Sequence, residues 1–133
     1  MTVAHVVVDA ANVVGSRPDG WWRDREGAAR RLAEQLAAAL AEPAALAAAV
    51  GVPAPIRVHV VLEGRAARAT DLPEHADLVV VRAPADGDST IAAVAAELPG
   101  DVVVVTADRE LRRIVAAGGA TVVGPGALRA VLR

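Results

Sequence analysis

The chain has 133 residues, of which 54% are hydrophobic and 23% charged, and its formal net charge is −2. This length and composition suit one folded domain rather than a disordered segment, so we expect a single domain over residues 1–133. The sequence contains no Cys, and all 14 of its basic residues are Arg. These two absences exclude disulfides, thiolate metal sites and chemistry that depends on a cysteine or lysine side chain.

The charge and the first residues also bear on partners and location. A net charge of −2 gives no long-range attraction for nucleic acid, so contact with phosphate would depend on local groups of arginines. The opening residues, MTVAHVVVDAAN, lack a basic leader, and their apolar run is too short to span a bilayer. We therefore expect a cytoplasmic protein without membrane attachment.

Strand-like and helical patterns alternate through the first half of the chain. Val3–Asp9 is a run of mostly β-branched residues that ends on a carboxylate, which predicts a buried strand. Gly15–Asp24 is predicted as a loop, and Arg25–Ala41 as a helix whose apolar residues repeat about every 3.6 positions. Pro43 either ends that helix or begins a short one running to residue 50. Ile56–Leu62 is the second predicted strand.

The same alternation continues to the end of the chain. After a mixed loop at Glu63–Asp77, the predicted elements are, in order, a strand at Leu78–Arg82, a helix at Ser89–Leu98, a strand at Asp101–Thr106, a helix at Asp108–Ala117, a strand at Thr121–Val123 and a helix at Ala127–Leu132. Such alternation indicates a parallel sheet covered on both faces, which is a three-layer α/β/α fold. With right-handed crossovers and the first strand central, about five strands take the order 3-2-1-4-5.

Acidic residues follow three of the predicted strands. Asp9 closes the first, Asp86 and Asp88 follow the third, and Asp108 follows the fourth. In the predicted order the first and fourth strands are neighbours, about 4.8 Å apart, so Asp9 and Asp108 can share one ion, and Asp88 enters the same crevice. Oxygen ligands favour Mg²⁺ or Mn²⁺ over zinc. The pattern therefore predicts a metal site at the carboxyl edge of the sheet.

Each of these residues also has a structural alternative. Asp86 or Asp88 could cap the helix predicted after them, and Asp108 could cap the helix that follows it, with Glu110 in its first turn. Asp9 differs, because the sequence indicates no helix for it to cap. Three carboxylates at one edge repel one another unless a cation or a proton intervenes, which favours the metal site.

Three segments of the chain resemble the signature segments of the NYN domain family, especially its YacP-like branch, within the PIN-like nuclease group. They are VVVDAANVV at Val6–Val14, ADGDSTIAA at Ala85–Ala93 and VVTADRELRR at Val104–Arg113. The resemblance spans nearly the whole chain in order. It implies a PIN-like α/β/α fold, with residues 1–133 forming one such domain, and metal-dependent ribonuclease chemistry.

The resemblance also implies roles for individual residues. The family's D-x-x-N, middle aspartate and T/S-x-D would supply the catalytic residues Asp9, Asn12, Asp88 and Asp108. The metal would be held by Asp9, Asp88 and Asp108, with Asp86 and Glu110 as further candidates. Thr106 is the first residue of the T/S-x-D match, and we expect it to contact the substrate.

Phosphodiester hydrolysis fits this set of residues. It needs an activated water and stabilisation of charge on the leaving oxygen, and one or two Mg²⁺ ions held by carboxylates provide both. We therefore expect a Mg²⁺- or Mn²⁺-dependent endoribonuclease. The alternatives are hydrolysis of the pyrophosphate of a free nucleotide at the same site, and a non-catalytic module of this fold that binds RNA or protein. The scattered His5, His59 and His75 form no catalytic set.

The segment after the first strand supplies candidates for gripping a single-stranded RNA. Trp21 and Trp22 could stack on bases, and Arg17 and Arg23 could hold phosphates, as could Arg109 beyond the fourth strand. In the alternative interpretation, one tryptophan packs on the Ala-rich helix and the other contacts a partner. The sequence leaves the oligomeric state open, a homodimer included.

Overall fold

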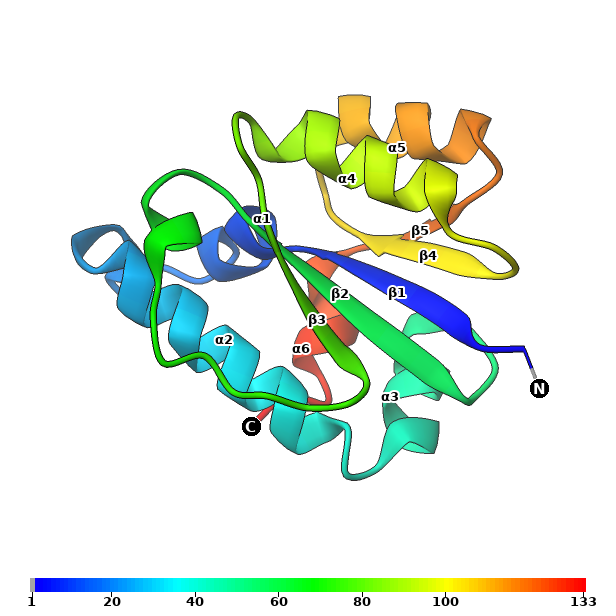
Figure 1. Cartoon of the computed structure of the whole chain (residues 1–133), viewed down its shortest axis with the longest axis horizontal. Helices are drawn as coiled ribbons and strands as arrows, with labels where there is room; N and C mark the ends of the chain where they lie inside the picture. Colours follow the sequence, from blue (N-terminus) through cyan, green and yellow to red (C-terminus); the bar gives the residue numbers. More distant parts are fainter. Residues whose placement is uncertain (1) are drawn as a thin grey trace.

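Five parallel strands form the centre of the molecule, in the order β3-β2-β1-β4-β5 (Figure 1). This computed structural model describes residues 2–133. The strands are β1 (Ala4–Asp9), β2 (Ile56–Leu62), β3 (Leu78–Arg82), β4 (Val102–Val105) and β5 (Thr121–Val123). Their order and direction confirm the predicted sheet, with β1 in the centre between β2 and β4. Because all the strands run in parallel, the segments that follow them meet at one edge.

Helices cover both faces of the sheet. On one face lie α1 (Ala10–Gly15), α2 (Arg25–Ala39), α3 (Pro43–Val50) and α6 (Pro125–Arg129). On the other lie α4 (Gly87–Glu97) and α5 (Arg109–Ala117), which stand above the sheet in Figure 1. Two 3-10 turns, η1 (Trp21–Arg23) and η2 (Gly64–Arg68), complete the described elements. This arrangement is the predicted three-layer α/β/α fold.

Strand residues of alternate positions supply the two cores. Val6 and Val8 belong to the cluster beneath α1, α2, α3 and α6, whereas Val7 belongs to the cluster under α4 and α5. Successive side chains of a strand point to opposite faces, so a strand buried on both faces is apolar over most of its length. This is why valine dominates β1, β2 and β4, with His5 and His59 as buried polar exceptions. None of the helices in residues 2–133 combines the length and the apolar character that crossing a bilayer requires.

The structure differs from the prediction mainly at short helices. The strands at Ile56–Leu62, Leu78–Arg82 and Thr121–Val123 have the predicted bounds, and Pro43 begins a separate helix. Helix α1 was not predicted, because six residues are too few to show a helical period. The last helix begins at Pro125 rather than residue 127, since proline is well suited to a first helical turn.

Two buried histidines are paired on the face of the sheet that α4 and α5 cover. His5 and His59 are each 7% exposed, and Nδ1 of His5 lies 2.9 Å from Nε2 of His59. Burial, followed by the charges of His5 and Arg57, lowers the pKa of His59 to about 4, and burial lowers the pKa of His5. The pair is therefore neutral in the folded protein near pH 7, with one ring donating to the other.

We expect this pair to make the folded protein sensitive to mild acid. The unfolded chain takes up a proton at His59 near pH 6.5, but the folded chain does so only near pH 4, so stability falls as the pH drops between these values. The loss attributable to His59 is about 3 kcal/mol by pH 4. Urea unfolding of the wild type and of His59→Gln, measured at several pH values, isolates this contribution. Equal pH dependence in the two proteins would contradict it.

Candidate functional site

Three helices begin at the carboxyl edge of the sheet, each capped by an aspartate. Asp9 Oδ1 accepts the Asn12 N–H at 3.2 Å, Asp86 Oδ1 the Ser89 N–H at 2.7 Å, and Asp108 Oδ1 the Leu111 N–H at 2.9 Å. The capping role considered for Asp86 and Asp108 is therefore present. The expectation that Asp9 has no helix to cap is wrong, because α1 begins at the next residue.

A hydrogen-bond network joins the ends of β1 and β4. The Thr106 hydroxyl donates to Asp9 Oδ2 at 2.8 Å and accepts the Asp108 N–H at 3.1 Å. The Ala107 N–H donates to Asn12 Oδ1 at 2.8 Å. Thr106 is fully buried with its hydroxyl engaged on both sides, so it positions Asp9 instead of contacting a substrate. Asn12 likewise fixes the segment that leads to Asp108.

The structure adds Glu63 to the predicted acids. Its Oε2 accepts the N–H of Gly87, the first residue of α4, at 2.5 Å. A Cβ atom at Gly87 would lie 2.6 Å from that oxygen, so any larger residue here would require the Glu63 carboxylate to move. Glu63 directly follows β2 and is two residues beyond Val61, which packs under α4 and α5. Its place immediately after a predicted strand was the signal available in the sequence.

Strand alternation directs these acids to one face. Asp9 is two residues after Val7, so it points to the side covered by α4 and α5, the helices that carry Asp88 and follow Asp108. Asp88 stands in the first turn of α4, beside the capping Asp86. The sheet order thus brings together Asp9, Glu63, Asp88 and Asp108, although they are far apart in the sequence.

The electrostatics of the site reflect this crowding. Burial raises the pKa of Asp9, which is 6% exposed, and the charges of Asp88 and Glu63 raise it further against the hydrogen bonds from Thr106 and Asn12. Burial also raises the pKa of Asp88, followed by the charges of Asp108, Glu63 and Asp86. Neighbouring carboxylates therefore add to the effect of burial in disfavouring ionisation of Asp9 and Asp88, and a cation would relieve this repulsion.

The donor set suits a hard cation, but it does not form a closed cage. Among residues 2–133, no three His, Asp or Glu side chains are placed to hold one ion together. One reason is that oxygens of Asp9, Asp108 and Glu63 are directed to backbone N–H groups. Mg²⁺ commonly keeps several waters and uses one or two carboxylates, an arrangement compatible with these side chains.

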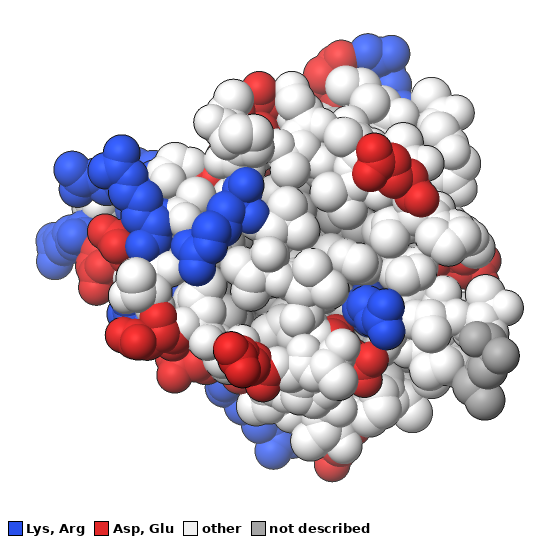
Figure 2. All heavy atoms as spheres, in the orientation of Figure 1, with Lys and Arg blue, Asp and Glu red and all other residues white. Residues whose placement is uncertain are grey.

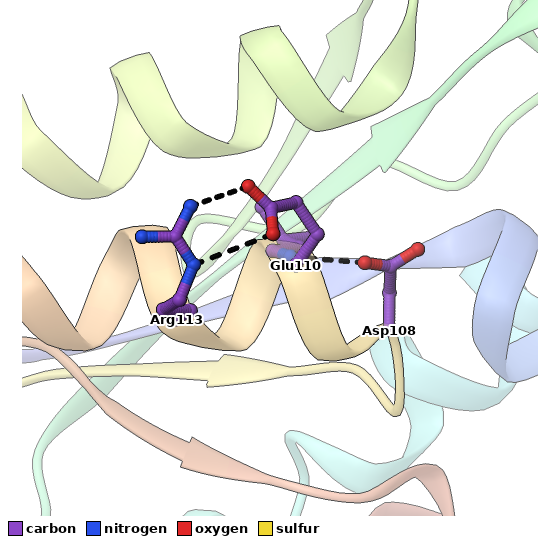
Figure 3. A network of polar contacts seen from close by, with 4 residues as sticks. Asp108, Glu110 and Arg113 are labelled. Atoms are coloured by element: carbon purple, nitrogen blue, oxygen red, sulfur yellow. Dashed lines mark hydrogen bonds and ion pairs between the residues drawn. The ribbon is translucent and has the colours of Figure 1, made fainter.

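Glu110 and Arg109 lie on α5 outside this cluster. Figure 3 shows the Glu110 carboxylate turned toward Arg113, with Oε1 at 2.5 Å from Nη2, while Asp108 points to the backbone of the same helix. The hydrogen bond from Arg113 lowers the pKa of Glu110, in contrast to the raised pKa of Asp88. Arg109 begins the helix and is exposed.

The two tryptophans occupy different environments. Trp21 is half-buried beside Gly15, and the Arg25 guanidinium lies 5.1 Å from its ring centroid. Trp22 is 50% exposed, with the Arg23 guanidinium 5.9 Å from its ring. Arg17 is also exposed. Figure 2 shows basic side chains gathered at the end of the molecule where α2 begins in Figure 1.

Comparison with known proteins bears on the fold. No protein-family model matches the sequence, and no curated protein is similar to it in sequence. Among solved structures, the chain is similar to Rae1 (YacP) from Bacillus subtilis, in a tryptophan-to-leucine variant, with a TM-score of 0.64 and 20% identity over 97% of this chain and 75% of that one. The chain has the fold of Rae1. The predicted resemblance to the YacP-like branch is thereby confirmed for the architecture.

The crowding of charge predicts opposite effects of two neighbouring substitutions. In EDTA at neutral pH, we expect Asp88→Asn to raise the melting temperature by about 2 °C, because it removes repulsion from a group whose pKa is raised. Asp86→Asn should lower it, because the hydrogen bonds from Ser89 lower the pKa of Asp86. Both variants remove one charge from the start of α4, so its dipole affects them equally. Equal melting temperatures, measured by calorimetry, would contradict the repulsion.

Proposed function

We propose that the carboxyl edge of the sheet is the active site of a Mg²⁺- or Mn²⁺-dependent endoribonuclease. The observation that carries the proposal is the convergence of Asp9, Glu63, Asp88 and Asp108, with the pKa values of Asp9 and Asp88 raised partly by neighbouring carboxylates. This cluster lies where ligands bind in open α/β sheets, at the point where the strand order reverses. The resemblance of three sequence segments to the NYN family and the Rae1 fold support the same activity.

The carboxylates differ in what they can contribute to a metal. Asp88 caps no helix, so its carboxylate is free of that contact and is the most available ligand. Asp9 and Asp108 each direct one oxygen to a backbone N–H, and Asp9 Oδ2 also accepts the Thr106 hydroxyl. Each carboxylate oxygen has two lone pairs, so both residues keep acceptor capacity for a cation. A cation held there would neutralise the phosphate and supply an activated water. Thr106 and Asn12 keep Asp9 and the Asp108 segment in register.

The remaining candidates would hold the RNA strand. A phosphate approaching four carboxylates is repelled, so positive groups must flank the site. Arg109 is exposed at the start of α5, and Arg23 lines a surface hollow with Arg25 and Arg65. We propose that Arg109 and Arg23 contact phosphates on either side of the cleaved bond. Stacking on the tryptophans would select unpaired bases and hence single-stranded RNA.

Cleavage assays test the catalytic assignment. We expect the wild type to cut single-stranded RNA with Mn²⁺ or Mg²⁺ and to be inactive in EDTA. Asp9→Asn and Asp88→Asn should each reduce the rate by about 100-fold or more, because each removes a charge that holds the cation. Glu97→Gln is the matched control, because it removes one carboxylate from the opposite end of α4. Equal activity in Asp88→Asn and Glu97→Gln would contradict the assignment.

Metal binding can be measured without turnover. Mn²⁺ should raise the melting temperature of the wild type, since a cation that binds only the folded state stabilises it, and should do so much less for Asp88→Asn. A melting temperature that stays constant across millimolar Mn²⁺, together with intact RNA, would instead indicate a non-catalytic binding module. Hydrolysis of nucleoside triphosphates with no cleavage of RNA would indicate a nucleotide hydrolase.

A further inference from the structure

A cavity of about 260 Å³ shares Glu63 with the acidic cluster. Three of its walls continue from the ends of strands: Ala10 follows Asp9, Gly64 follows Glu63, and Ala85 precedes Asp86. Trp21 and Arg25 form a further wall. Ala11, Arg25, Gly64 and Ala85 are exposed, so the cavity is open to solvent. A molecule in the cavity would therefore contact Glu63, the carboxylate that the cavity shares with the acidic cluster.

The lining of this cavity is suited to a flat, neutral ring. Small aliphatic side chains, including Val14 and Ala29, make up most of the wall, and the Arg25 guanidinium lies over the Trp21 ring, 5.1 Å from its centroid. Aromatic rings and guanidinium planes are the groups on which proteins stack unpaired bases. Glu63, which also lines the cavity, disfavours a phosphate and can accept N–H groups of a base.

The size of the cavity limits its occupant. Pockets for drug-sized ligands measure about 300–1,000 Å³, so a cavity of about 260 Å³ suits one ring system better than a whole nucleotide. The sugar and phosphate of a bound nucleotide would then remain outside, toward the carboxyl edge. This is the position that a phosphodiester bond must take to reach the acidic cluster.

The walls of the cavity are held in place before any ligand binds. Trp21 lies beside Gly15 and meets Trp22 edge-on, with the ring centroids 5.9 Å apart. Arg82 Nη1 donates to the Ala67 carbonyl of η2 at 2.6 Å, and Arg30 Nε donates to the carbonyl of Thr70, just after η2, at 2.8 Å. A preformed cavity binds with little cost of ordering its side chains.

From these observations we infer that the cavity binds one unpaired nucleobase of an RNA strand, the base next to the phosphodiester bond at the acidic cluster. The identification of the ligand as RNA rests on the proposed function, but binding of the base requires neither metal nor cleavage. Trp21 is the stacking residue, whereas Trp22 lies outside the cavity and lines a separate hollow. The two adjacent tryptophans thus provide an internal comparison.

Fluorescence tests the cavity directly, because the chain contains two Trp and no Tyr. In Trp22→Phe, all indole emission comes from Trp21. Titration with adenosine, guanosine, cytidine and uridine in EDTA, excited at the red edge of indole absorption, should give saturable quenching with at least one nucleoside. In Trp21→Phe, where only Trp22 emits, no saturable quenching is expected. Absence of quenching by all four nucleosides in Trp22→Phe, or equal quenching in both variants, would overturn the inference.

RNA binding provides the second test, carried out in the Asp88→Asn protein so that cleavage does not interfere. Adding Trp21→Ala should weaken binding of a single-stranded oligonucleotide by about 5-fold to 150-fold, the range expected for one lost base stack. Trp21→Phe should restore most of the affinity, and Trp22→Ala should weaken binding less than Trp21→Ala. Equal losses for the two alanine variants would overturn the assignment of Trp21.

These readouts separate the two proposals. Quenching of Trp21 by nucleosides in a wild type that never cleaves RNA would retain the base cavity and refute the nuclease. Metal-dependent cleavage in a protein whose Trp21 fluorescence responds to no nucleoside would support the nuclease and refute the base cavity.

Discussion

Hydrogen bonds from helix N-termini to carboxylates hold the candidate site together. In a parallel sheet covered by helices, the chain must turn from a strand into a helix repeatedly at the same edge. At three of these turns an aspartate accepts the first free N–H groups of the helix, and Glu63 adds a fourth contact at Gly87. The positive end of each helix dipole compensates for part of the carboxylate charge. The pKa values of Asp9 and Asp88 are nevertheless raised, first by burial and then by neighbouring carboxylates.

Much of the fold could be predicted because buried parallel strands have a simple pattern. The valine runs of β2, β3 and β5 are bounded by turn residues, and their alternation with helices gives the order of the sheet. Helix α1 was missed because AANVVG is shorter than two helical turns and contains two β-branched residues. That omission also affected the site, since without α1 the capping role of Asp9 could not be recognised.

The candidate site was less predictable, because its contacts join residues that are distant in the sequence. Asp86 and Asp88 look alike in the sequence, and only the structure separates the cap from the carboxylate whose pKa is raised by burial and by the charges of Asp108 and Glu63. The Glu63–Gly87 bond spans 24 positions, and the Thr106–Asp9 bond spans 97. A pattern within one short stretch of sequence cannot reveal either of these two hydrogen bonds. The sequence motif did include Thr106, but its burial and its hydrogen bonds make it a positioning residue.

The acidic cluster and the neighbouring cavity favour different chemical groups of one ligand. The cluster repels anions, so a phosphate can approach it only with a cation or flanking arginines, and that part of binding must weaken with salt. The cavity presents alanines and an aromatic ring, so its contribution comes from burial and stacking, which salt affects little. A nucleotide joins the two properties in one molecule, with a neutral ring linked by a sugar to an anionic phosphate. Glu63 belongs to both sites, and Ala10, which lines the cavity, directly follows Asp9 in the chain. The turn from β1 into α1 thus contributes a carboxylate to one site and a small side chain to the other.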